Sequence, residues 1–166
     1  MTFPRRTMPD FPLIFDYQST TPCSKAVQEA MAPYWQDFWG NPSSRQNRLG
    51  IHASAAVSLA RDTFASYLRI KSNQVIFTSG ATEANNLALI GHARARLLHV
   101  GSPGHIITLS TEHHAVLDPC RQLKNEGFRV TELDPDSNGL ISIDRLKSAF
   151  KNDTFLVSIM MANNEI

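Results

Sequence analysis

The sequence has no long apolar run, only two cysteines and almost no net charge. No hydrophobic stretch approaches the roughly 20 residues of a membrane-spanning helix. Arg5 and Arg6 lie near the N-terminus without an apolar run behind them, so we expect no secretory signal. Cys23 and Cys120 have neither metal-ligand spacing nor the pattern of a disulfide framework. A formal charge of +1 gives no electrostatic argument for nucleic acid or an anionic membrane surface. These absences favour a cytoplasmic protein with no nucleic-acid, membrane or metal partner.

The composition is that of an ordinary globular chain, with 42% hydrophobic and 19% charged residues. A length of 166 residues fits one domain with a sizeable core, or a piece of a larger one. The N-terminal part predicts two amphipathic helices, over residues 24–38 and 51–68, joined by a turn-rich loop over residues 39–50. Pro33 is expected to kink or end the first of these helices.

After Lys71 the sequence alternates regularly between strand and helix patterns. We expect strands over residues 74–79, 105–110, 128–133 and 154–162, and helices over residues 82–99, 115–126 and 143–150. Gly127 is a natural stop for the second of these helices. The first is expected to turn Leu87, Ile90, Leu97 and Leu98 inward. Such alternation indicates an α/β fold, a mostly parallel sheet with flanking helices, built from right-handed βαβ units.

The last predicted strand is apolar throughout, as is typical of a central parallel strand that is buried on both faces. It is followed by "NNEI", where the sequence ends. A strand of this kind needs a covering element, so we expect the chain to be the first part of a larger fold. We also expect the uncovered strand to pair with another chain, giving a dimer or a complex with a second fragment.

Three polar clusters follow predicted strands at the same edge of the sheet. The first is the Ser79–Thr82 turn, where a helix N-terminus offers free amides to a phosphate; a plain helix cap is the alternative. The second holds His113 and His114, which either contact a ligand or lie on the surface as ordinary loop residues. The third is Asn163, Asn164 and Glu165. Because ligands of open α/β sheets bind at this edge, the three clusters together predict a ligand site.

Five stretches of the sequence carry a resemblance to a known family. They are "FDYQSTTP", "GNPSSRQNRLG", "VIFTSGATEANNLAL", "TEHHAVLDPCRQL" and "LVSIMMANNEI". In this order and spacing they closely resemble the cysteine desulfurases, which are fold-type I pyridoxal 5'-phosphate (PLP) enzymes of the class V aminotransferase group. The resemblance runs from about residue 15 to residue 166 and covers less than half of a family member. It implies the first part of the large PLP-binding domain.

The resemblance also implies a cofactor and roles for individual residues. Ala81 and Thr82 would donate hydrogen bonds to the PLP phosphate. His113 would stack on the pyridine ring and take part in proton transfers, which makes it the one candidate catalytic residue. Asn164 would hydrogen-bond the phenolic oxygen of the ring. The implied organisation is an N-terminal tail over residues 1–14, a segment with helices and an interface loop over residues 15–70, and an incomplete PLP-binding domain over residues 71–166.

Other family residues have no counterpart in this sequence. In the family, the Asp and Gln that contact the cofactor, the Ser-x-His-Lys stretch with the Schiff-base lysine, and the sulfur-accepting cysteine all fall beyond the position of Ile166. The five lysines of this chain lie in other contexts. Cys23 and Cys120 fall outside the position of the family nucleophile and are interpreted as structural. In the turn-rich loop, the family has a histidine where this chain has Asn47.

The resemblance leads to two hypotheses of different classes. In the first, the chain is the N-terminal portion of a cysteine desulfurase, which converts L-cysteine to L-alanine and passes the sulfur to an enzyme cysteine for iron–sulfur cluster assembly. A homodimer, a complementing C-terminal fragment and a sulfur-acceptor scaffold are the implied partners, and the chain alone would be inactive. In the second, it is a catalytically dead binding or assembly module. Within the enzyme class, a selenocysteine lyase or another class V relative is the alternative.

Overall fold

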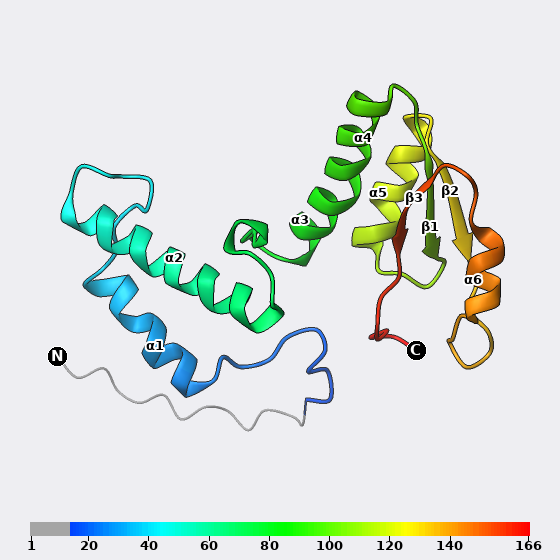
Figure 1. Ribbon diagram of the computed structural model, residues 1–166. Helices are drawn as coiled ribbons and strands as arrows, with labels where there is room; N and C mark the ends of the chain where they lie inside the picture. The colour runs from blue at the N-terminus through cyan, green and yellow to red at the C-terminus, as the bar shows by residue number, and fades with distance from the viewer. Residues whose placement is uncertain (1–13) are drawn as a thin grey trace. The chain divides into compact units, whose positions relative to one another are not determined.

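The computed structural model describes residues 14–166, and the chain divides between Ile76 and Phe77 into two compact units. The N-terminal unit holds α1 (Lys25–Gln36), α2 (Arg48–Leu68) and the short 3-10 turn η1 (Ser72–Gln74). Figure 1 shows α1 in blue and α2 in cyan to green. The two predicted helices of this part are therefore confirmed.

Side chains of neighbouring residues set the starts of α1 and α2. The Ser24 hydroxyl accepts a hydrogen bond from the Val27 amide, and the Asn47 side chain accepts one from the Gly50 amide at 2.8 Å. Because Asn47 is such a cap, α2 begins three residues before the predicted start, and the expected loop ends at Asn47 rather than Gly50.

Pro33 does not end α1, which continues to Gln36. The Pro33 carbonyl still accepts hydrogen bonds, from the amides of Asp37 and Phe38 at 2.8 and 2.9 Å. The helix therefore ends one turn after the proline. Of the two predicted outcomes, an end at Pro33 itself is wrong, and a kink there stays a prediction. What the ring removes is a donor on its N-terminal side, whereas the carbonyl on its C-terminal side stays available.

The C-terminal unit is built on a parallel sheet of β1 (His105–Leu109), β2 (Arg129–Leu133) and β3 (Thr154–Ser158). The strand order is β2-β1-β3, and the three arrows point the same way in Figure 1. Every residue of β1 is buried. The parallel α/β class is confirmed, but β1, not the last strand, is central. β3 lies at the edge of this sheet and is half-buried, and it spans five residues instead of the nine predicted.

Residues 75–78 do not form the predicted strand. Val75 has an extended backbone, with φ −94° and ψ 121°. A strand also requires a hydrogen-bonded neighbour, and among the described residues the sheet consists of β1, β2 and β3 alone. The β-branched pattern of "VIFT" thus predicts the extended backbone correctly, but the segment pairs with no neighbouring strand in the part of the chain that the structure describes.

The long predicted helix after this segment is present but not uniform. It consists of α3 (Ala81–Asn86), the π-helical turn η2 (Leu87–Gly91) and α4 (His92–Val100). A π turn adds a residue to the helical repeat and so rotates the following stripe. Leu89 and Ala93 are buried, whereas Leu87 is 47% and Leu98 86% exposed. The prediction that these two leucines face inward is therefore wrong; Ile90 and Leu97 do pack against the core.

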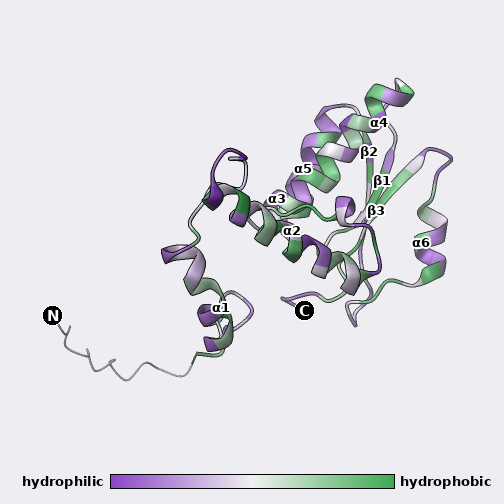
Figure 2. Ribbon diagram, turned by 60° about the vertical axis from the view of Figure 1, so that its left-hand side comes forward, coloured by the Kyte–Doolittle hydropathy of each residue, from purple (hydrophilic) through white to green (hydrophobic). Residues whose placement is uncertain are grey.

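The remaining helices are α5 (His114–Asn125) and α6 (Ile143–Ala149). α3, α4 and α5 lie on one side of the sheet and α6 on the other, in both Figure 1 and Figure 2. α5 ends before Gly127, which has a left-handed φ of 92°, so the predicted stop is confirmed. Figure 2 shows apolar residues on the strands. The core joins that sheet to the helices on its α5 side through Leu89, Ala93, Ile106, Val116, Cys120, Leu123 and Phe128.

No helix among residues 14–166 combines the length and the apolar character that crossing a membrane requires.

Candidate functional site

The N-terminus of α3 presents free amides beside a glycine. The first hydrogen bond of this helix runs from the Ala84 amide to the Gly80 carbonyl at 3.1 Å. Helix geometry leaves the amides of Ala81, Thr82 and Glu83 without an intrahelical acceptor, and their dipoles favour an anion. The exposed Thr82 hydroxyl lies in the same turn. The donor set that this turn offers is suited to a phosphate.

Glu83 removes Ser79 from that donor set. The Glu83 carboxylate accepts hydrogen bonds from the Ser79 amide at 2.6 Å and from the Ser79 hydroxyl at 2.7 Å. These bonds, the hydroxyl first, hold the pKa of Glu83 below its usual range, so the group is ionised at neutral pH. An incoming anion therefore finds the free amides of Ala81, Thr82 and Glu83, together with the Thr82 hydroxyl, as donors in this turn.

Gly80 leaves open space in front of the turn. Its backbone is extended, which any residue adopts, and a Cβ at this position would meet nothing within 4 Å. Neither the local conformation nor the packing of the described residues demands a glycine at this position. A glycine at this position would let a bound group approach the backbone closely, which suits a phosphate.

His113 is the N-cap of α5 and comes directly from the loop after β1. Its Nδ1 accepts a hydrogen bond from the Ala115 amide at 3.0 Å, so the neutral imidazole carries its proton on Nε2. The ring of His114 lies edge-on to it, with ring centroids 6.4 Å apart. The cap thus fixes the His113 ring on an exposed loop and leaves Nε2 available as a donor.

A polar recess of about 360 Å³ joins the two helix N-termini. Thr82 and Asn86 line it from α3, and His113 lines it from the start of α5. Its other lining residues are His114, Ala115, Asp118, Pro119 and Gln122. The structure therefore brings together two of the predicted site residues, Thr82 and His113, and places Ala81 in the adjoining first turn of α3.

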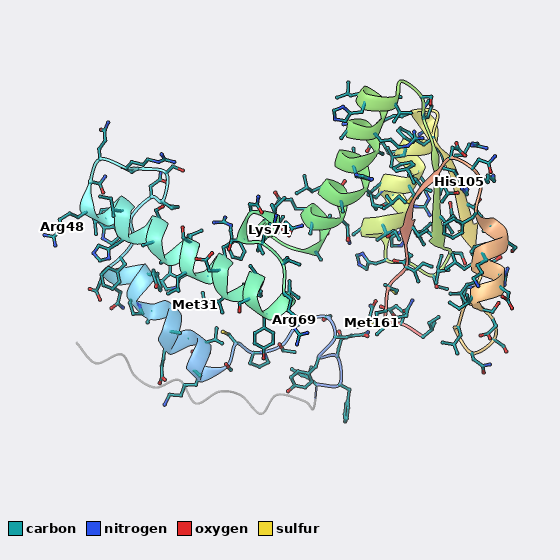
Figure 3. The ribbon with its side chains drawn as sticks, viewed as in Figure 1. Met31, Arg48, Arg69, Lys71, His105 and Met161 are labelled. Atoms are coloured by element: carbon teal, nitrogen blue, oxygen red, sulfur yellow. The ribbon has the colours of Figure 1, made fainter. Side chains whose placement is uncertain are left out.

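Asn164 does not line this recess. It is exposed in the loop after β3, where its Nδ2 donates to the Glu165 carboxylate at 2.9 Å. The loop itself is held near the start of α5, because Asn163 Nδ2 donates to the Thr111 carbonyl at 2.8 Å. Figure 3 labels Met161 on this segment after β3 and His105 at the opposite end of the sheet.

Sequence reasoning missed the polar residues that extend the recess along the helices. Asn86 follows Thr82 by four residues, and Asp118 and Gln122 follow His114 by four and eight. Residues at these spacings share one helix face. The sequence thus contained two polar helical stripes that line the recess. They could be recognised as parts of one site only once α3 and α5 were known to be neighbours.

The two cysteines differ in environment. Cys120 is fully buried in the core, and burial raises the pKa of its thiol to about 11. Its thiol is therefore neutral at physiological pH and matches the structural interpretation. Cys23 is exposed just before α1, and its interpretation as a structural residue stays a prediction. Among residues 14–166, no three His, Cys, Asp or Glu side chains gather as a metal site would require.

Comparison with known proteins identifies the family. The family model for class-V aminotransferases matches residues 13–166. The chain belongs to this family. The curated relatives include the cysteine desulfurase IscS of Colwellia psychrerythraea, 48% identical over 157 residues, and that of Ehrlichia chaffeensis, 49% identical over 157 residues. These alignments cover 93% and 95% of this chain.

Solved structures show the same relationship. SspA in complex with cysteine is 41% identical, aligns over 92% of this chain and has a TM-score of 0.83. A NifS-like protein is 36% identical over 91% of the chain, with a TM-score of 0.84. The fold class and the resemblance expected from the five motifs are therefore confirmed. The chain spans 38% and 37% of the length of the two curated relatives, and 43% and 40% of the two solved chains.

Proposed function

We propose that residues 77–166 hold PLP at the carboxyl end of the sheet, and that the chain provides this part of a cysteine desulfurase. The observation that carries the proposal is the shared recess, because Thr82 and His113 line it from two different helix N-termini. The names of the relatives supply the reaction, and the solved complex of SspA with cysteine supports L-cysteine as the substrate.

Each residue is assigned the role that the family resemblance implies for it. The amides of Ala81 and Thr82, with the Thr82 hydroxyl, bind the phosphate at the start of α3. The His113 ring packs on the pyridine face, and its Nε2 proton is available for exchange with the substrate. Asn164 donates from the loop after β3 to the ring oxygen, once its side chain turns from Glu165. When bound, PLP supplies an electron sink for the substrate carbon atoms, while the protein fixes its orientation.

The proposal also covers the fate of the sulfur and the assembly of the chain. The sulfur taken from cysteine would pass to an enzyme cysteine and then, through an acceptor scaffold, to iron–sulfur cluster assembly. A homodimer is supported by the free edge that β3 shows among the described residues. The cytoplasmic location and the division at residues 14/15 and 70/71 stay predictions.

The test is equilibrium dialysis of the 166-residue chain against PLP and, separately, against inorganic phosphate. We expect the chain to bind PLP weakly but more tightly than phosphate, because only PLP reaches the ring contacts. Thr82→Ala is expected to weaken both ligands several-fold, since both use the hydroxyl. Thr82→Ser keeps the hydroxyl and should retain most of the affinity. An unchanged affinity in Thr82→Ala would contradict the assignment.

A sulfide-release assay tests the enzymatic part. The chain alone, with cysteine and PLP, should release sulfide no faster than free PLP, because covalent catalysis requires a lysine and a cysteine placed in the site. Co-expression with the remaining C-terminal portion of a relative, such as the enzyme of Colwellia psychrerythraea, is expected to restore release. Failure of a folded, PLP-loaded complex to release sulfide would favour the binding-module hypothesis.

A further inference from the structure

Two ties fasten the loop of His113 to the loop of Asn164, beyond the end of the sheet ladder. β1 and β3 pair as far as Thr108 and Ser158. Past this point, the Met160 amide donates to the carboxylate of Glu112 at 2.6 Å. Farther along, Asn163 Nδ2 donates to the Thr111 carbonyl at 2.8 Å. Hydrogen bonds from side chains therefore link the two chain segments beyond the point where the backbone pairing of β1 and β3 stops.

Glu112 is placed as a built-in acceptor. Only 6% of its surface is exposed, although it is a potentially charged residue in a loop. Burying a carboxylate is costly unless it is hydrogen-bonded, and charge-assisted bonds to backbone amides are among the stronger ones. A buried carboxylate that spans from one strand end to the next therefore indicates a positional requirement at this edge of the sheet.

The positions of the ties along the chain show what they place. Glu112 directly precedes His113, and Asn163 directly precedes Asn164. Asn163 Oδ1 also accepts a hydrogen bond from the Glu165 amide at 2.7 Å, which turns the backbone around Asn164. Each proposed ring-binding residue is thus the immediate neighbour of a residue that ties one loop to the other.

We propose that Glu112 is a positioning residue that sets the spacing between the His113 ring and the Asn164 amide, with Asn163 acting beside it. The inference rests on the proposed function, because it assigns the His113 ring to the face of one bound ring and the Asn164 amide to the oxygen of that ring. It predicts that loss of the tie impairs contacts to the PLP ring and spares those to the phosphate, which Ala81 and Thr82 make from α3.

The experiment compares Glu112→Ala with Glu112→Gln in the 166-residue chain. The glutamine keeps an acceptor oxygen for the Met160 amide, whereas alanine removes it. We expect Glu112→Ala to weaken PLP binding at least about fivefold and to leave binding of inorganic phosphate within about twofold. Glu112→Gln should bind both probes within about twofold of the unchanged chain. A parallel loss of both probes in Glu112→Ala, or no loss of either, overturns the inference.

Amide hydrogen exchange, followed by NMR, reads the tie without any cofactor. The Met160 amide should exchange at least about tenfold faster in Glu112→Ala than in the unchanged chain or in Glu112→Gln. Equal exchange in all three overturns the inference whatever PLP does. If the tie is present but the unchanged chain binds PLP no better than phosphate, the proposed ring contacts fail, and the positioning role of Glu112 fails with them.

A second variant covers the outcome in which Glu112→Ala does not fold. Asn163→Asp keeps the acceptor for the Glu165 amide but loses the donor to Thr111 at a half-buried site. It should weaken PLP binding selectively over phosphate, as Glu112→Ala does. A folded Asn163→Asp chain with unchanged PLP affinity overturns the inference.

Discussion

The amide of Ala115 donates a hydrogen bond to Nδ1 of His113 at 3.0 Å, so one side chain both caps α5 and faces the recess. Replacement by alanine removes both roles and should lower the free energy of unfolding by about 1 kcal/mol. Replacement by asparagine, a good N-cap, should retain the stability. Urea unfolding curves of the two variants measure the contribution of the cap to stability, because only His113→Ala loses the cap while both variants lose the ring.

The same pair of variants tests the stacking role of His113. Both His113→Ala and His113→Asn should weaken PLP binding by about threefold to tenfold, since both lose the aromatic ring. His99→Ala is the matched control, because His99 is also exposed but does not line the recess, and it should bind PLP nearly as the unchanged chain does. Full PLP affinity in the stably folded His113→Asn would show that the ring makes no contact.

The thiols should differ sharply in reactivity. At pH 8 an aromatic disulfide reagent is expected to label one thiol per chain, at the exposed Cys23, and to reach Cys120 only after unfolding. Burial and the pKa of about 11 keep the Cys120 thiol both inaccessible and neutral. Cys23→Ser should therefore abolish labelling of the native chain, and rapid labelling of that variant would place Cys120 outside the core.

Much of the fold could be predicted because βαβ units leave a strong periodic signal. The strand at residues 105–109 and the helix at residues 114–125 appear within one residue of their expected bounds. Edge and centre were not distinguishable, since an apolar strand such as β3 looks the same in either place. The exposure of Leu98 could not be predicted either, because the π turn over Leu87–Gly91 has no recognisable residue pattern.

The sequence predicted the main residues of the candidate site but not the residues that hold their loops in place. Thr82 and His113 were predicted to lie together because parallel strands deliver their following loops to one edge, and they do share the recess, although the strand expected before Thr82 is not formed. Glu112 stood in the quoted "TEHH" stretch without a role, as its partner is a backbone amide 48 residues away. A hydrogen bond to a distant backbone amide leaves no pattern of side chains in the sequence. The Met160 side chain therefore gives no sign of the contact.

Asn47 allows a test of helix capping in the N-terminal unit. The family that the chain resembles has a histidine at this position. Its Oδ1 accepts from the Gly50 amide at 2.8 Å, and its Nδ2 donates to the Ser44 hydroxyl at 2.7 Å. Asn47→Ala should lower the free energy of unfolding by about 1 kcal/mol, and Asn47→Asp, which keeps the cap, by less. Urea unfolding followed by the fluorescence of Trp35 and Trp39 reports on this unit. Equal stability of all three chains would contradict the capping role.

His105 gives the chain a predicted sensitivity to acid. It is fully buried at the start of β1, where Nδ1 meets the Thr154 hydroxyl at 2.7 Å and Nε2 meets the Thr131 hydroxyl at 2.8 Å. Its pKa is lowered, first by desolvation and then by Lys151 and Arg129, while Asp153 opposes them. The neutral ring thus links the three strands at the amino end of the sheet, away from the candidate site.

The sign of the pH effect follows from that lowered pKa. The unfolded chain binds the His105 proton more readily than the folded one, so the stabilisation is fully present above the unfolded pKa near 6.5 and is lost as the pH falls through the folded value. Unfolding free energies from urea titrations should therefore decrease between pH ~7 and ~5. His105→Gln, which can bond both threonines but does not titrate, should flatten this dependence, whereas the exposed His99→Gln should not. An equal slope in His105→Gln and the unchanged chain would mean that His105 is not the group whose protonation weakens the fold.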